Sequence, residues 1–195
     1  APDGSDARVL VEDEKLSAFA PTVGPGGRIH FHGVPPQPAR SHPPLDQGAV
    51  YSVAADGSDR RLEVASDRLA ACQMPAVGPE GRIACHGPGP TDELRAKSNG
   101  NPLLRRGTHR TVELPDRTVE LVGMHGYFAD FLPDGRITYA EWLPQSTQVD
   151  NWGLPPIVIS QIDGSDRRVV LDAEAGLPAW ATSACPQGDW IAFNA

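Results

Sequence analysis

Histidine side chains recur at matching places in this sequence and are its most reactive candidates. His32 and His86 lie 54 residues apart, each near the end of a short apolar segment, and His30 lies two residues before His32. Imidazole titrates near neutral pH and ligates transition metals, so a cluster could transfer protons or bind a metal. Structural, hydrogen-bonded histidines are the favoured interpretation, so no cofactor is predicted. A divalent metal held by His30, His32 and His86 is the alternative.

Signature motifs of common enzymes are absent from the sequence. It contains no Gly-x-Ser-x-Gly nucleophile elbow, no His-Glu-x-x-His metalloprotease motif, no phosphate-binding loop and no dinucleotide-binding fingerprint. The Asp-Gly-Ser-Asp segments lack the spacing of calcium ligands over roughly 12 residues that defines an EF-hand loop. Their residue types are those that favour a tight turn, which is explanation enough for the motif. Whether the chain is an enzyme is left open, and these absences favour a protein without catalytic activity.

The amino-acid composition limits the kinds of binding partner that can be expected for this protein. The 195 residues include 17 basic and 25 acidic side chains, for a formal net charge of −8, which argues against a nucleic-acid partner. No run approaches the ~18 apolar residues of a membrane span. The three cysteines, Cys72, Cys85 and Cys185, are too few and too scattered for a disulfide framework or a Cys-x-x-Cys metal site, so they leave the redox compartment open.

An internal repeat of about 54 residues defines the elements that position these side chains. A Pro-x-Gly turn recurs in steps of 54, 54 and 53 residues, at Pro25, Pro79, Pro133 and Pro186. An Asp-Gly-Ser-Asp turn keeps the same spacing, at Asp3, Asp56 and Asp163. A fixed period of this kind is the signature of a repeat protein.

Short segments of alternating apolar and polar residues lie between these turns, a pattern typical of β-strands. Apolar side chains alternate after each Pro-x-Gly turn, as in Ile29 and Phe31 or Ile137 and Tyr139, so one face of each strand should be buried. Short antiparallel strands in a repeating unit predict a propeller. We therefore predict an all-β fold, a β-propeller of four-stranded antiparallel blades. Four units are represented, as a small ring or as part of a larger propeller.

The repeat divides the chain, predicted to be a single β-propeller region over residues 1–195, into successive units. These units span residues 1–16, 17–69, 70–122, 123–175 and 176–195. The first is expected to supply the last strand of a split blade, and the last is expected to supply the first two strands of a blade. Further blades or a second domain in a parent chain are the alternative to a closed ring.

The last unit resembles the WD-like repeat of TolB-type propellers. The resemblance rests on residues 163–170 and 177–193, the second of which contains Pro-Ala-Trp, Cys-Pro-Gln-Gly and Ile-Ala-Phe. It extends to all four units, although Gly-Pro-Gly-Gly, Gly-Pro-Glu-Gly and Cys-Pro-Gln-Gly replace the family's Ser-Pro-Asp-Gly. The resemblance implies a scaffold shared by periplasmic partner-binding proteins, by gating propellers of prolyl-oligopeptidase-type peptidases and by some lyases. It also implies an extracytoplasmic location, periplasmic or secreted.

The strand order predicts which face carries function. Three long connections, at residues 34–48, 88–109 and 142–155, are expected on one face because successive strands alternate in direction. Long loops on a rigid scaffold commonly carry binding sites. Glu141 beside Trp142 could form a sugar-stacking pocket, whereas half-buried tryptophans under stiff loop covers are the alternative. The candidate ligand-binding residues in or beside these loops, or in a crossover on the same face, are His42, Arg105, Arg106, His125, Glu141, Trp142 and Trp152.

These observations favour a non-catalytic binding or scaffold module that presents long loops to a protein, peptide or carbohydrate partner. The first alternative is a propeller enzyme, a lyase or a hydrolase, whose histidine-rich rim binds a metal. The second alternative is a propeller that gates a prolyl-oligopeptidase-type peptidase domain.

Overall fold

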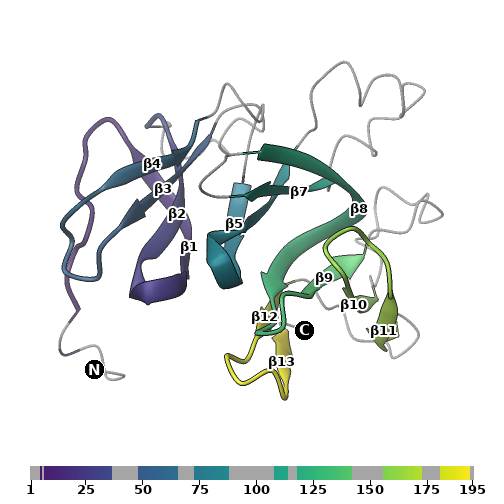
Figure 1. The fold of residues 1–195 in the computed structure, drawn as a ribbon. Helices are drawn as coiled ribbons and strands as arrows, with labels where there is room; N and C mark the ends of the chain where they lie inside the picture. Colours follow the sequence, from purple (N-terminus) through teal and green to yellow (C-terminus); the bar gives the residue numbers. More distant parts are fainter. Residues whose placement is uncertain are drawn as a thin grey trace, which may run out of the picture.

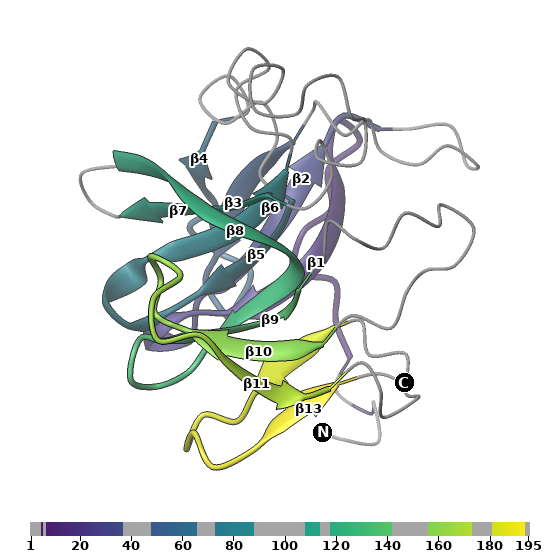
Figure 2. The same ribbon diagram turned by 90° about the vertical axis from the view of Figure 1, so that its right-hand side faces the viewer.

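The computed structural model has an all-β fold built from antiparallel sheets (Figures 1 and 2). It describes residue 5 and residues 7–36, 48–65, 73–87, 108–113, 118–141, 156–172 and 181–193, with backbone alone at 73, 86–87, 108–113 and 118–127. No helix in these residues has the length and apolar character that a membrane crossing needs. The predicted fold class is confirmed by the sheet arrangement that follows.

The predicted units that begin at residues 17, 70, 123 and 176 are here numbered 1 to 4, and each is also called a blade. Unit 1 is a four-stranded antiparallel sheet in which the strands follow one another in chain order. Its strands are β1 (Ser17–Val23), β2 (Ile29–Val34), β3 (Ala49–Val53) and β4 (Arg61–Val64). Unit 4 is described by two antiparallel strands, β12 (Thr182–Ala184) and β13 (Ile191–Phe193).

Units 2 and 3 share one strand and together make a seven-stranded antiparallel sheet. Unit 2 consists of β5 (Gln73–Val77), β6 (Ile83–Gly87), β7 (Thr108–Glu113) and the first part of β8 (Thr118–Phe131). Unit 3 consists of the second part of β8 with β9 (Ile137–Glu141), β10 (Ile157–Ser160) and β11 (Arg168–Leu171). Residues 118–125 of β8 pair with β7, and residues 126–131 pair with β9.

The continuous strand β8 corrects the expected position of His125. This residue lies within β8, where its backbone pairs with that of Thr108, and it does not lie in a crossover loop. An extended chain rises about 3.3 Å per residue, so one strand of this length can pass from the outer edge of one sheet to the inner edge of the next. Both views show β8 running from β7 to β9 (Figures 1 and 2).

The repeated turns form as their residue types predict. Each Pro-x-Gly turn closes a hairpin through a backbone hydrogen bond, and the bonds from the nitrogens of Gly24, Gly78 and Leu132 are all 2.8 Å long. The first two turns are short 3-10 helices, η1 (Pro25–Gly27) and η2 (Pro79–Gly81). In the Asp-Gly-Ser turns, Asp56 accepts hydrogen bonds from the backbone nitrogen of Ser58 at 2.9 Å and from its hydroxyl at 2.6 Å. This is the predicted aspartate turn chemistry.

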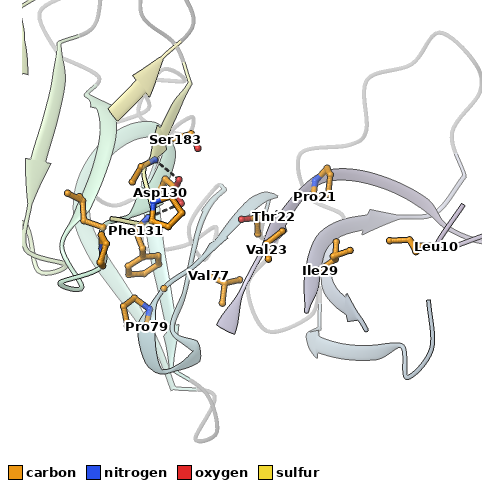
Figure 3. A pocket seen from close by; sticks show the side chains of 15 residues that line it. Leu10, Pro21, Thr22, Val23, Ile29, Val77, Pro79, Asp130, Phe131 and Ser183 are labelled. Atoms are coloured by element: carbon orange, nitrogen blue, oxygen red, sulfur yellow. Dashed lines mark hydrogen bonds between the residues drawn. The ribbon is translucent and has the colours of Figure 1, made fainter. Parts of the chain in front are cut away.

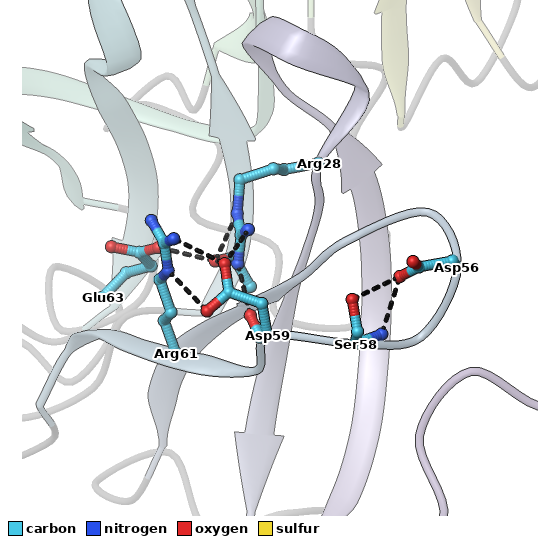
Figure 4. A network of polar contacts seen from close by, with 7 residues as sticks. Arg28, Asp56, Ser58, Asp59, Arg61 and Glu63 are labelled. Carbon is cyan, nitrogen blue, oxygen red and sulfur yellow. Dashed lines mark hydrogen bonds and ion pairs between the residues drawn. The ribbon is translucent and has the colours of Figure 1, made fainter.

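A polar network fastens the two turns of unit 1 to each other (Figure 4). The Arg28 guanidinium donates to the Asp59 carboxylate at 2.9 Å and to the Ser52 hydroxyl at 2.9 Å. The Ser52 hydroxyl in turn donates to Glu63 on β4 at 2.5 Å. Because these contacts join the starts of β2 and β4 through β3, the network holds the tight-turn end of the sheet in a fixed shape.

Apolar side chains of adjacent units interdigitate to form the core. Val50 and Val64 of unit 1 pack with Val77, Ile83 and Cys85 of unit 2. A second cluster joins unit 2 to unit 3 and contains Ala76, Ala84, Phe131, Ile137, Tyr139 and Val158. Each sheet therefore buries its face against the next sheet, as in a repeat protein whose units cannot bury their surfaces alone.

One cysteine of this core is oxidised, which the cysteine spacing did not lead us to expect. Cys85 is disulfide-bonded, whereas Cys185 is a free, buried thiol. The sequence has one further cysteine, so we expect Cys72, which lies outside the described residues, to be the partner. The prediction of no disulfide framework is compatible with one such bond, but the redox state is no longer open at Cys85.

Candidate ligand site between the inner strands

Three of the strands that begin a unit carry the same backbone irregularity. The pairing register shifts within β1, β5 and β8, and in each shift one residue other than glycine has a positive φ. These residues are Ala20 at 47°, Met74 at 49° and Phe128 at 50°, spaced 54 residues apart. A left-handed conformation costs such a residue about 1–2 kcal/mol, so the bulges are imposed by their surroundings.

The bulges converge on a common space. Ala20, Met74 and Phe128 all line one cavity of about 200 Å³ together with residues 181–183 of unit 4. An adjoining cavity of about 720 Å³ continues toward the tight turns and is lined by all four units. The two cavities share Pro21, Thr22, Asp130 and Ser183. Strained backbone often marks functional sites. The larger cavity adjoins the space around the bulges through these four shared residues, and this cavity, the central pocket, is our candidate site.

The central pocket has an apolar wall with few polar groups. Thr22 and Val23 of β1 lie on one side, and Asp130 and Phe131 of β8 lie on the other, with Val77 between them (Figure 3). The remaining lining residues are Leu10, Pro21, Ile29, Gly78, Pro79, Leu132, Pro133, Ser183, Ala184 and Pro186. Its volume and its mostly apolar lining match those of small-ligand and peptide sites, for which about 300–1,000 Å³ is usual.

Asp130 is the one charged residue that lines this pocket among the residues that the structure describes. Its carboxylate accepts hydrogen bonds from the backbone nitrogens of Phe131 at 2.9 Å and Ala184 at 2.8 Å, and a third from the Ser183 hydroxyl. Burial nevertheless raises the pKa of Asp130, and the three hydrogen bonds offset only part of that effect. The carboxylate is thus held in a fixed orientation at a half-buried position.

Hydrogen bonds from β12 tie unit 4 to unit 3 beside the pocket. The Thr182 hydroxyl donates to the backbone oxygen of Phe128 at 2.7 Å, next to the bond from Ala184 to Asp130. Both bonds join residues that are 54 positions apart and so are equivalent in the repeat. Hydrogen bonds between units 3 and 4 therefore hold the part of the pocket wall that contains Asp130.

The predicted histidine site is only partly described. His30 and His32 lie on β2 with 4% and 2% of their surfaces exposed. His30 packs where the hairpin of unit 1 meets Val77 of unit 2, and its Nδ1 has no hydrogen-bond partner among the described atoms. The side chain of His86 lies outside the described residues. Within the described ranges no three histidine, cysteine or acidic side chains group as a metal site would require, so metal binding at His30, His32 and His86 stays a prediction.

Most of the predicted loop residues also fall outside the described part of the chain. This applies to His42, Arg105, Arg106, Trp142 and Trp152 and to the side chain of His125. Glu141 is described, and its carboxylate accepts hydrogen bonds from the Arg167 guanidinium, one of them 2.6 Å long. This ion pair joins β9 to the start of β11, so it engages the carboxylate that we predicted for sugar binding.

Sequence reasoning missed Asp130. Its equivalents in the repeat, at steps of 54 residues, are Thr22, Ala76 and Ala184. The sequence did contain a signal for this residue, because the equivalent strand positions of the other units are uncharged. The bulges left no such signal, because Ala20, Met74 and Phe128 are not residues that favour a positive φ.

The burial of His30 predicts a pH-dependent stability. Burial lowers the pKa of His30 below 6.5, and the Glu63 charge and a backbone hydrogen bond with Arg28 oppose this lowering only in part. The unfolded chain then binds more protons than the folded chain, so stability is complete above pH 6.5 and falls on acidification by at most about 1.4 kcal/mol per pH unit. Urea unfolding at pH 7.5, 6.5 and 5.5 should show this slope, and His30→Gln should reduce it. An unchanged slope in the variant would contradict the assignment.

Comparison with known proteins agrees with this architecture. No protein-family model matches the sequence, and no curated protein matches it with significance. The structure of putative TolB from Agrobacterium tumefaciens superposes with a TM-score of 0.52 at 15% identity, over 96% of this chain and 62% of that chain. The fold is that of a β-propeller.

A second propeller match is a luciferin-regenerating enzyme, with a TM-score of 0.51 and 11% identity over 94% of this chain and 56% of that chain. The chain spans less than two thirds of the length of either structure, and at these identities the likeness is one of fold alone. In the propeller, β1, β5, the second part of β8 and β12 are the inner strands of successive blades. The central pocket lies where these inner strands converge.

Proposed function

We propose that this propeller is a non-catalytic binding module that receives a segment of a protein partner in the central pocket. The observation that carries the proposal is the pocket itself, which is about 720 Å³, mostly apolar, and built by the inner strands of four blades. The polar groups in its wall are few and are held by hydrogen bonds, which suits recognition of an apolar segment with one polar feature.

The tight-turn face is the docking face that the described residues support. The pocket is lined by the ends of the inner strands and by Pro79, Pro133 and Pro186 of the Pro-x-Gly turns. The opposite face, with the long loops predicted to bind a protein, peptide or carbohydrate, stays a prediction because those loops lie outside the described residues. Binding at the central pocket does not require the loops to take part.

An extracytoplasmic location is part of this proposal. The disulfide at Cys85 supports it, since disulfides persist in oxidising compartments and are rare in the cytosol. The resemblance to TolB-type repeats points the same way.

An enzyme is the second candidate, because one of the matched propellers is by its name a luciferin-regenerating enzyme. In the sequence, His32 and His86 are candidate residues for the active site of such an enzyme. Metal analysis of the purified protein, before and after substitution of both histidines by alanine, tests it. Stoichiometric metal that is lost in the double variant would favour the enzyme over the binding module.

A peptide-display experiment tests the binding function. Selection from a random dodecapeptide library on the intact chain should yield peptides that bind wild type. Val23, which lines the pocket and is 68% exposed, can be changed to tryptophan without entering the core. Val23→Trp should fill the pocket mouth and weaken the selected peptides at least tenfold, as measured by isothermal titration calorimetry.

The matched control is Leu62→Trp, an equally conservative change at a residue 45% exposed on β4, outside the lining of the pocket. Peptide affinity should be unchanged in this variant. Peptides that bind wild type and Val23→Trp equally well would place binding elsewhere and contradict the proposed function.

A further inference from the structure

We infer that the central pocket recognises a basic side chain, lysine or arginine, whose charged end pairs with Asp130 and whose aliphatic stem lies along the apolar wall. The inference rests on the proposed function and names the chemistry of the partner segment. It follows from the charge, the orientation and the position of one carboxylate.

The orientation of Asp130 leaves it able to accept a further hydrogen bond. Two backbone N–H groups and the Ser183 hydroxyl occupy three of the roughly four acceptor positions of a carboxylate. These donors fix the side chain from β8 and β12, so a ligand would not have to order it. Pre-organisation of this kind reduces the entropic cost of binding.

The charge of Asp130 has no counter-charge among the described residues. The pocket lining contains no lysine, arginine or histidine, and no charged side chain contributes to the pKa of Asp130. From the neighbouring inner strands, the described residues that line the pocket are all uncharged: Pro21, Thr22 and Val23 of β1, Val77 of β5, and Ser183 and Ala184 of β12. A half-buried carboxylate without a cation is complementary to a cationic ligand.

Asp130 accepts a hydrogen bond from the backbone nitrogen of Ala184 in unit 4, but blade packing does not by itself require a carboxylate at this position. The equivalent positions in blades 1 and 2 are Thr22 and Ala76, and both blades pack against their neighbours without a charge there. An uncharged residue at position 130 would also avoid the cost of burying a carboxylate. A cationic ligand that pairs with the carboxylate would offset this cost.

The pocket wall suits the stem of a basic side chain. Val77, Phe131 and Pro133 give the pocket apolar surface, and Phe131 lies next to Asp130 (Figure 3). Lysine and arginine commonly bury their methylene stems on such a surface and keep the charged end at a polar group.

Two matched fragments test the inference on the intact chain. Cyclohexylmethylammonium and cyclohexylmethanol share one carbon body and differ in charge. We expect the ammonium compound to bind at least tenfold tighter at pH 7, measured by backbone chemical-shift titration of labelled protein. Asp130→Asn should reduce its affinity to that of the alcohol and leave the alcohol unaffected. The control Asp134→Asn, at a turn carboxylate paired with Arg136 outside the pocket lining, should preserve the preference.

A pH titration of the wild-type protein needs no substitution and covers the case in which Asp130→Asn fails to fold. Protonation of Asp130 removes the charge, so the preference for the ammonium compound should disappear on acidification. Because burial raises the pKa of Asp130, this loss should occur at a higher pH than for an exposed aspartate. A preference that persists after protonation would overturn the inference.

Failure of this inference can be told apart from failure of the proposed function. Equal affinity for the two fragments, or tighter binding of the alcohol, would overturn recognition of a basic group while leaving the pocket a binding site. If neither fragment binds, the inference is also overturned. The proposed function is then judged separately, by whether the selected peptides lose affinity for Val23→Trp.

Discussion

Replacement of Gly78 by alanine will lower the free energy of unfolding by about 3 kcal/mol, because the added methyl group has no space. A Cβ at this position would lie 2.5 Å from the Cγ and Cδ1 atoms of the Phe131 ring. The backbone of Gly78, at φ −91°, suits any residue, so the cost is steric and not conformational. Phe131 belongs to the core between blades 2 and 3, which leaves the ring little room to move.

Two further variants test whether the loss of stability comes from the steric contact with Phe131. Gly27→Ala adds a methyl group in open space at a φ of +74°, so it should cost only the conformational strain of about 1 kcal/mol. Phe131→Leu should recover part of the loss caused by Gly78→Ala, so the two changes should be less damaging together than their sum. Additive losses in urea unfolding would show that the glycine is required for another reason.

The contact explains why the repeat contains glycine before two of its turns. Gly24 approaches Val77 of the next blade as Gly78 approaches Phe131, and a Cβ on Gly24 would lie 2.9 Å from Val77. Val77 and Phe131 are themselves 54 residues apart. The glycine therefore permits close contact between neighbouring blades beside the central pocket, which Gly78, Val77 and Phe131 line.

Loss of the disulfide at Cys85 will destabilise the protein by about 3 kcal/mol. If Cys72 is the partner, the bond closes a loop over residues 72–85, and the chain-entropy cost of such a loop in the unfolded state gives this magnitude. The bond also restrains β5 and β6, the first two strands of blade 2, which contribute to both core clusters.

Thiol titration and denaturation under two redox conditions check this prediction. The denatured, unreduced chain should show one reactive thiol, that of Cys185, and three after reduction. Dithiothreitol should shift the urea midpoint of wild type to that of Cys85→Ser and leave the midpoint of Cys85→Ser unchanged. Three reactive thiols before reduction would show that the bond does not form.

The repeat made the architecture predictable because its signals are local. A Pro-x-Gly or Asp-Gly-Ser sequence sets its own backbone, as the hydrogen bonds of Asp56 and Asp163 to the following serines show. Alternation around Ile29 and Ile137 likewise marks a strand with one buried face. Four-stranded antiparallel sheets could be read from these features before any contact between sheets was known.

The candidate site could not be read in the same way, since it depends on contacts between residues 54 positions apart. Histidines at equivalent positions left a metal site as the alternative to structural histidines, and no local sequence pattern showed that His30 would be buried between blades. Glu141 appeared free to bind a sugar, but the fold brings Arg167 to it. Asp130 differs from its uncharged equivalents in the other units, but only the structure shows that it lines a pocket with otherwise uncharged residues among those described.

The sequence by itself determined the strands, the turns between them and the repetition that makes a propeller, because each of these follows from residues adjacent in the chain. Only the tertiary structure decided that three strained residues, Ala20, Met74 and Phe128, meet around one cavity and that Asp130 is the one carboxylate among the described residues of its wall. The physical reason is that burial and charge compensation belong to neighbours in space, and those neighbours come from different blades.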